Sequence, residues 1–147
     1  MFQSIKDVAL IVLVIAAGGG FKQVLIDSGV GVYIKSLSEG FSLSPLLLAW
    51  SVAALLRVSL GSATVAGLTA AGIVLPFLSQ PGVHPELMVL AVGAGSLMFS
   101  HVNDTGFWMF KEYFNLTLKQ TFQSWTMMET IVSISGLVGV LLLDQII

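Results

Sequence analysis

The stretch SPLLLAWSVAALLRVSLGSATVAGLTAAGIVLPFLS, residues 44–79, decides the fold. It contains two apolar runs, 45–58 and 65–79, joined by the small and polar residues 59–64, which we call the tip. Each run is about 14–15 residues long, or about 21–23 Å of helix, whereas the hydrocarbon core of a bilayer is roughly 30 Å thick. This pattern favours a re-entrant hairpin, which enters the membrane and leaves it on the same side. Two full spans stay open as the alternative.

The ends of this hairpin carry further signals. Ser44 and Pro45 are typical of the cap and the first position of a helix. Non-helical backbone within the membrane is tolerated only where it is buried in protein or lines a water-filled cavity. The tip is therefore expected to lie against another part of the protein or in a wet cavity.

Charged side chains are scarce throughout the chain. Lys and Arg number 6 and Asp and Glu number 8 among 147 residues, and hydrophobic residues make up 56%. The charged share is 10%, against roughly 25% in an ordinary soluble domain. So few charges cannot cover the surface that a soluble domain of this size exposes. We therefore expect the lipid bilayer to surround this protein, and we exclude a soluble domain and a disordered chain.

Composition also excludes several kinds of site. The scattered basic residues and the net charge of −2 provide no basic patch, so no nucleic-acid partner is expected. The lack of Cys excludes disulfide frameworks, Cys-based zinc sites and thiol catalysis. We interpret the apolar N-terminus as part of the fold in preference to a signal peptide, because the chain continues into more membrane-like sequence.

The predicted fold is an all-α membrane protein of five segments. They are a span at 7–26, a connector at 27–44, the re-entrant hairpin at 45–79, a broken helix at 86–116 and a final span at 121–143. Glycines 18–20 are expected to weaken or break the first span, because glycine is a poor helix former. The connector is expected to be interfacial, with a short helix around residues 33–37.

The pattern of residues 86–116 predicts one discontinuous helix. The apolar run ELMVLAVGAGSLMF (86–99) leads into the polar segment SHVNDTG (100–106), and FWMFKEYF (107–114) is apolar again. In the final span we interpret Trp125 as an interfacial anchor. Glu129 lies inside that span and fits a cytoplasmic-end residue or an ion-pair partner better than a proton carrier.

Basic residues predict the orientation. Lys111 and Lys119 share one loop, which the positive-inside rule places in the cytoplasm. Lys6 then also lies inside, whereas Lys35 in the outer connector disagrees with the rule. The C-terminus is expected outside the cytoplasm, in the periplasm.

Polar residues at the tip and in the polar segment form the candidate substrate site. Broken helices expose half-helix ends with partial charges, and transporters use such ends to hold anions and coupling ions. Hydroxyls, amides and free backbone N–H groups suit a polyhydroxylated carboxylate. The alternative is that these small residues serve close helix packing and capping. The candidate substrate-binding residues are Ser59, Gly61, Ser62, Thr64, Ser100, Asn103 and Thr105.

Three charged or titratable residues are candidates for proton coupling or for a charge partner: His101, Asp104 and Arg57. An ionisable group inside a membrane indicates function, and His titrates near neutral pH. As alternatives, Asp104 would cap a helix that starts near Gly106, and His101 would bind backbone carbonyls freed by the interruption. The i, i+3 spacing of His101 and Asp104 has no third ligand beside it, so no metal site is expected.

Arg57 precedes the tip, where its permanently charged fork suits a carboxylate. Its alternatives are a structural ion pair with Asp104 or Glu129, or snorkelling to the interface. The sequence has no nucleophile elbow, HExxH motif or Ser-Lys arrangement. An intramembrane enzyme would need a nucleophile or metal that is not evident. We therefore expect no catalytic residues, no enzyme activity and no cofactor other than a proton as coupling ion.

Four stretches together resemble a known family. They are IAAGGGFKQVLIDSGVG (15–31), residues 44–74 of the hairpin, AVGAGSLMFSHVNDTGFWMFKEYF (91–114) and TFQSWTMMETI (121–131). They are similar to the C-terminal part of the gluconate:proton symporter (gluconate permease, GntP) family, and SHVND followed by GFW is the most specific match. That family belongs to an ion-transporter superfamily with inverted repeats, re-entrant hairpins and broken helices.

The resemblance implies a function and partners. It implies the second inverted repeat of a secondary transporter that imports gluconate or a related sugar acid across the bacterial inner membrane with protons. Its partners would be the sugar-acid anion, the bilayer and the remaining N-terminal repeat, and a homo-oligomer stays open. A truncated or separately encoded subunit that packs with a first-repeat partner and does not itself transport is the alternative. The residues that match the family's tip and break are Gly61, Ser62, Ala63 and Thr64, and residues 100–105.

Overall fold

The computed structural model describes residues 2–38 and 44–147, and within these ranges it contains helices and no strands. The elements are α1 (Phe2–Asp27), α2 (Val30–Ser38), α3 (Pro45–Leu60), α4 (Ala63–Val74), the 3-10 turn η1 (Leu75–Ser79), α5 (Pro85–Gly95), α6 (Thr105–Tyr113), α7 (Leu118–Thr121), the π-helical turn η2 (Phe122–Thr126) and α8 (Met127–Leu143).

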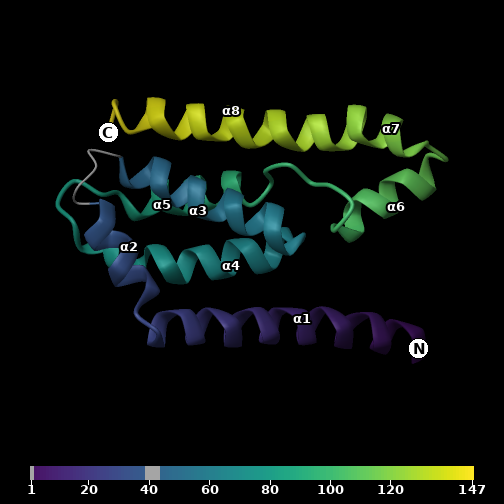
Figure 1. The fold of residues 1–147 in the computed structure, drawn as a ribbon, viewed down its shortest axis with the longest axis horizontal. Coiled ribbons are helices and arrows are strands. Elements are labelled where there is room, and N and C mark those ends of the chain that lie inside the picture. Colours follow the sequence, from purple (N-terminus) through teal and green to yellow (C-terminus); the bar gives the residue numbers. More distant parts are fainter. Residues whose placement is uncertain (1, 39–43) are drawn as a thin grey trace.

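The long helices form the two outer sides of the molecule. Helix α1 lies along one side, and α7, η2 and α8 form one continuous rod along the other, with α3, α4 and α5 between them (Figure 1). Helix α1 packs on α4, α4 on α3, α3 on α5, and α5 on α8. The hairpin of α3 and α4 thus lies between α1 on one side and α5 and α8 on the other.

The hairpin follows the local signals in its sequence. Ser44 caps α3, because its hydroxyl accepts a hydrogen bond from the Leu46 N–H at 3.3 Å, and Pro45 occupies the first turn. At the other end Gly61 has the left-handed φ of +72°, and its N–H donates to the Arg57 carbonyl at 2.9 Å. Ser62 then caps α4. The predicted cap at Ser44 is confirmed, and the tip is a tight turn between two helices.

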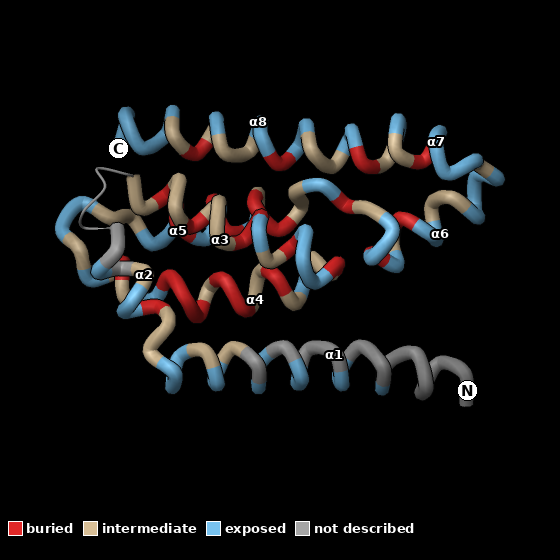
Figure 2. The backbone as a smooth tube through the Cα atoms, viewed as in Figure 1, coloured by how far each residue is buried: buried red, intermediate tan, exposed pale blue. Residues whose placement is uncertain are grey.

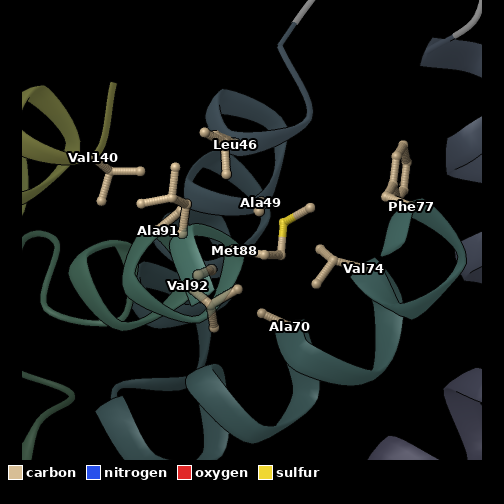
Figure 3. Packing of buried hydrophobic residues seen from close by; sticks show 11 residues of the cluster. Leu46, Ala49, Ala70, Val74, Phe77, Met88, Ala91, Val92 and Val140 are labelled. Atoms are coloured by element: carbon tan, nitrogen blue, oxygen red, sulfur yellow. The ribbon is translucent and has the colours of Figure 1, made fainter. Parts of the chain in front are cut away.

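Small side chains let the central helices approach closely. Ala49 and Ala53 of α3, Ala70 of α4 and Ala91 of α5 are fully buried. Figure 3 shows Met88 between these alanine-bearing helices, with Val140 of α8 at the edge of the cluster. Small residues at helix contacts are typical of membrane proteins, in which close backbone packing replaces the hydrophobic effect between helices.

The outer face of α8 is apolar and exposed (Figure 2). The continuous helix Leu118–Leu143 is long and apolar enough to cross a membrane, and most of it is not buried in the chain. A core helix of a soluble protein would instead be covered. The large exposed side chains on α8 are Met127, Met128, Ile131, Val132, Ile134, Val138 and Leu142.

Two sequence-based expectations about helix continuity are wrong. Helix α1 runs unbroken from Phe2 to Asp27 through all three glycines, because glycine keeps both backbone hydrogen-bonding groups and these need internal partners in lipid. In the discontinuous helix, α5 ends at Gly95 rather than at Phe99. Residues 96–104, which we call the break, separate it from α6, and Phe99 within the break has a φ of +49°.

Candidate functional site

The tip and the break are in direct contact. The Asn103 side-chain amide in the break donates to the Val58 carbonyl near the end of α3 at 2.8 Å. Gly61 lies so close to the Asn103 carbonyl that an added Cβ would collide with it. The two polar clusters predicted from the sequence therefore form one region, built from segments about 40 residues apart in the chain.

A buried ion pair lies beneath this contact. Arg57 Nη2 is 2.6 Å from Asp104 Oδ2, and the two residues are only 2% and 8% exposed. The Ser100 hydroxyl donates to the same carboxylate oxygen, and the Gly106 N–H donates to Oδ1 at 3.0 Å. Hydrogen bonds to an ionised carboxylate are strong. Asp104 thus both caps α6 and pairs with Arg57, so the cap and the ion pair predicted as alternatives are confirmed.

The final helix supplies two residues that sequence reasoning missed. Trp125 Nε1 donates to the Ser100 hydroxyl at 2.8 Å, and the buried Thr126 hydroxyl donates to the Ser100 carbonyl at 2.5 Å. Both belong to the π-helical turn η2, and such turns are frequent at functional sites. Trp125, predicted from the sequence as an interfacial anchor, also has its indole N–H in the network around the break.

His101 lies apart from the ion pair. Its Nδ1 is 3.0 Å from the Phe99 carbonyl, and its ring packs against the Phe99 ring with the centroids 5.5 Å apart. This is the arrangement weighed as an alternative to proton coupling, in which a carbonyl freed by the interruption binds the imidazole. The Arg57–Asp104 network described above does not include His101.

The remaining candidate residues lie around the contact between tip and break. The Ser59 hydroxyl donates to the Leu55 carbonyl of its own helix at 2.8 Å, and the Ser62 hydroxyl accepts from the Val65 N–H at 3.4 Å. Thr64, Asn103 and Thr105 are exposed. The side chains of Thr64 and Thr105 are thus presented outward, Asn103 is exposed but uses its amide on the Val58 carbonyl, and the two serines serve mainly local structure.

Helix ends give this region its polarity. Helices α4 and α6 begin here, at Ala63 and Thr105, and α3 ends here at Leu60. The beginning of a helix carries partial positive charge from its free N–H groups. The region therefore combines the start of α4, which favours an anion, and the start of α6, where the Asp104 carboxylate already lies, with exposed hydroxyl and amide groups.

A separate apolar cavity of about 350 Å³ lies between α4, η1 and α5. Its lining includes Ala71, Leu75, Met88 and Val92 and contains no charged or hydroxyl-bearing side chain. It cannot form the hydrogen bonds that a polyhydroxylated carboxylate needs. The polar region at the tip and the break is therefore the better candidate site.

A family model described as "GntP family permease" matches residues 1–146. The chain belongs to the GntP permease family. The GntP chain is 60% identical over 147 residues to the "High-affinity gluconate transporter" of Escherichia coli (strain K12), covering all of this chain and 34% of that protein. It is 60% identical over 144 residues to the "Gnt-II system L-idonate transporter" of the same strain, covering 98% of this chain and 33% of the relative.

A third relative is the "Gluconate permease" of Bacillus subtilis (strain 168), with 54% identity over 144 residues, 98% of this chain and 32% of the relative. The GntP chain thus spans about a third of the length of these curated relatives. No solved structure is significantly similar to it. The resemblance noted in the sequence is confirmed, and the relatives are transporters and permeases, in agreement with the expectation that the chain is not an enzyme.

Proposed function

We propose that this chain is part of a proton-coupled permease for gluconate or a related sugar acid, which binds its substrate where the tip meets the break. The contact of Gly61 and Asn103 above the buried Arg57–Asp104 pair is the observation that carries the proposal. It places hydroxyl, amide and backbone N–H groups from two broken elements side by side. The curated relatives named for gluconate and idonate support the substrate class.

A sugar acid would use two kinds of contact in this site. Its carboxylate is favoured near the N-terminus of α4, whose first N–H groups carry partial positive charge, whereas Asp104 already occupies the N-terminus of α6. Its hydroxyls match the exposed side chains of Thr64, Asn103 and Thr105, which both donate and accept hydrogen bonds. The facing wall of the site would come from the rest of the permease, since this chain matches only about a third of its relatives.

The arrangement of α3 and α4 supports a re-entrant hairpin. The start of α3 and the end of α4 lie at the same end of the molecule, and the tip lies part-way along α8 (Figure 1). Helix α3 has 16 residues and α4 has 12, against 26 for the helix Leu118–Leu143. A hairpin of two short arms beside a long span is what a second inverted repeat of this transporter type would contain.

Helix ends also support the predicted orientation. The start of α1 and the turn between α6 and α7 lie together at one end, and the C-terminus lies at the other (Figure 1). Lys111 and Lys119 flank that turn. By the positive-inside rule this end faces the cytoplasm, and the C-terminus faces the periplasm of a bacterial inner-membrane protein.

The proposal is tested by transport in a chimera. Residues 1–147 replace the matching segment of the Escherichia coli high-affinity gluconate transporter, and uptake of labelled gluconate is measured in cells that lack other gluconate uptake. Asp104→Asn is expected to abolish uptake, because the buried Arg57 loses its charged partner and truncating one partner of a buried pair is strongly destabilising. Ser62→Ala is expected to reduce it, because the start of α4 loses its cap.

Matched control variants test whether the loss of uptake is specific to residues of the site. Asp144→Asn changes an exposed acid at the end of α8, and Ser28→Ala removes an exposed hydroxyl that bonds only a carbonyl of the preceding helical turn. Both are expected to retain uptake. Normal uptake by Asp104→Asn and Ser62→Ala alike would refute the assigned site.

A further inference from the structure

Glu129 lies on the face of α8 that packs against the site. Thr126, Glu129 and Ser133 are spaced three and four residues apart and so share one helix face. The Thr126 hydroxyl binds the Ser100 carbonyl in the break, and the Ser133 hydroxyl accepts from Trp50 Nε1 of α3 at 3.1 Å. Thr126 and Ser133 are buried and Glu129 is half-buried. Glu129 therefore lies on the face of α8 that packs against the break and α3.

The contacts Thr126–Ser100 and Trp50–Ser133 also fix the position of Glu129 along the helix axis relative to Arg57. Arg57 lies two helical turns beyond Trp50 towards the tip, and Thr126 lies two turns before Ser133, which is about 10 Å in each case. Glu129 falls within this interval. Its charge accordingly interacts with those of both Arg57 and Asp104. An acid thus faces the buried ion pair from the third element of the site.

Arg57 has unused hydrogen-bonding capacity. Only its Nη2 binds Asp104, whereas Nε and Nη1 are buried and have no partner among the described residues. Leaving buried donors of a charged group unpaired is costly, so such groups normally have partners. Two donors of the guanidinium fork are therefore buried without a partner, and a second carboxylate would satisfy them.

The other titratable groups on the elements around Glu129 are not the charges that act on its carboxylate. The charges that act on Glu129 are those of Arg57 and Asp104. Among the described residues on the helices and loops around α8, Glu86 lies in the first turn of α5, His101 lies on the Phe99 carbonyl, and Lys111 and Glu112 of α6 pair with each other at 2.7 Å. The others lie at helix ends: His84 before α5, Tyr113 at the end of α6, Lys119 in α7 and Asp144 at the end of α8. One cation therefore serves two acids.

We propose that Glu129 is the proton-binding site of the permease and that it shares Arg57 with the substrate carboxylate. This inference rests on the proposed function. It replaces the interpretation of Glu129 as a structural residue and does not require His101 to titrate. The ion pair of Arg57 and Asp104 keeps its charge throughout, and Glu129 alone changes protonation.

Charge balance links the proton to the substrate. With Glu129 ionised, the site holds one cation and two carboxylates, and this excess negative charge opposes a sugar-acid anion. A proton from water binds one oxygen of the Glu129 carboxylate and neutralises it, which leaves the free donors of Arg57 to the substrate carboxylate. The loaded site and the empty ionised site then carry the same net charge. When the substrate leaves, the positive charge of Arg57 again favours the ionised form of Glu129. Glu129 then releases its proton to water on the opposite side of the membrane.

The test uses the chimeric permease in proteoliposomes, with two measurements. The first is accumulation of labelled gluconate driven by a pH gradient, and the second is exchange of labelled for unlabelled gluconate without a gradient. At one proton per substrate, a gradient of one pH unit supports about tenfold accumulation. Glu129→Gln is expected to lose this accumulation and to retain exchange, because the amide mimics the protonated acid. Glu129→Asp is expected to accumulate gluconate, and Glu112→Gln, at an exposed acid, is the matched control.

Each outcome bears on one proposal. Gradient-driven accumulation by Glu129→Gln would overturn the inference, and so would loss of both accumulation and exchange at normal expression, which would indicate a structural or substrate-contacting role. An unmodified chimera that neither accumulates nor exchanges gluconate would instead refute the proposed function itself. The inference is supported if the Glu129→Gln variant exchanges gluconate without accumulating it while the unmodified chimera and Glu112→Gln do both.

Discussion

Gly61 is the residue on which the contact between tip and break depends most directly. It combines a left-handed φ of +72° with a close approach to the Asn103 carbonyl. The first property favours glycine because other residues are strained there. The second leaves no room for a Cβ. A glycine in this position therefore serves both the turn and the packing of another segment on it.

Substituting Gly61 by Ala should separate these two effects when it is compared with Gly82→Ala. Gly82 also has a positive φ, +79°, but has open space around it. We expect Gly82→Ala to cost about 1–2 kcal/mol of stability from backbone strain and to retain transport. Gly61→Ala should cost about 1–3 kcal/mol more from overpacking and should abolish gluconate uptake. Thermal unfolding in detergent and uptake by the chimera measure the two quantities, and equal effects of both variants would contradict the close contact.

Some residues of the site can be predicted from sequence and others cannot. Asp104 is identifiable because polar residues interrupt an apolar run. Both the helix cap weighed for Asp104 and the ion pair weighed for Arg57 are realised. Trp125 and Thr126 cannot be identified as site residues from the sequence. An aromatic residue near the start of a span, such as Trp125, is also typical of an interfacial anchor. Their role depends on a π-helical turn and on packing against Ser100, neither of which leaves a local signal.

At the scale of the elements, the glycines of α1 show where propensity fails as a guide. Three glycines in succession predict a weakened helix, yet α1 is continuous. Propensity is a difference of about 1 kcal/mol per residue, whereas unpaired backbone groups within a membrane cost several kcal/mol each. The helix stays continuous because breaking it would cost more than keeping the glycines helical. The interruption between α5 and α6 occurs instead where polar side chains and Asp104 provide partners for the freed backbone.

Glycines in two different helices should therefore respond oppositely to alanine. A Cβ at Gly20 of α1 would meet nothing within 4 Å, whereas at Gly95 of α5 it would collide with the Trp50 carbonyl and lie 2.8 Å from the Ala53 Cβ. We expect Gly20→Ala to stabilise the chain by up to about 1 kcal/mol and Gly95→Ala to destabilise it by about 1–3 kcal/mol. Thermal unfolding of the purified chain in detergent measures both, and a stabilised Gly95→Ala variant would show that α3 and α5 are not packed this closely.

At the scale of the whole molecule, the scarcity of charge determines which surfaces exist. Most charged residues lie in connectors or at helix ends, and the outer face of α8 is apolar. Arg57, Asp104 and Glu129 converge on one site although three separate elements carry them, namely α3, the break and α8. Membrane character and family can be read from composition and motifs. The position of Glu129 beside Arg57 and Asp104 cannot be predicted from composition or motifs, because it depends on which face of α8 packs against α3.

The chain by itself should not transport. The polar groups of Thr64, Asn103 and Thr105 are exposed here, and the chain spans about a third of the length of its relatives, so one wall of the proposed site is missing. We expect liposomes that contain only residues 1–147 to show no gluconate-dependent proton flux above that of empty liposomes. The chimera is the positive control. Flux with the chain alone would show that it encloses a complete pathway.

The bond between the Asn103 amide and the Val58 carbonyl has one more consequence, together with the ion pair below it. These links fasten the hairpin to the segment that leads into α6, so neither can swing as a separate flap. If the permease alternates between two open states, we expect both pieces to travel as a rigid body and the hinges to lie in the connectors outside them. Because Ser100 in the break binds Trp125 and Thr126, and Trp50 of α3 binds Ser133, η2 and α8 would move with this block. Access would then be controlled by how the whole assembly slides against the rest of the permease.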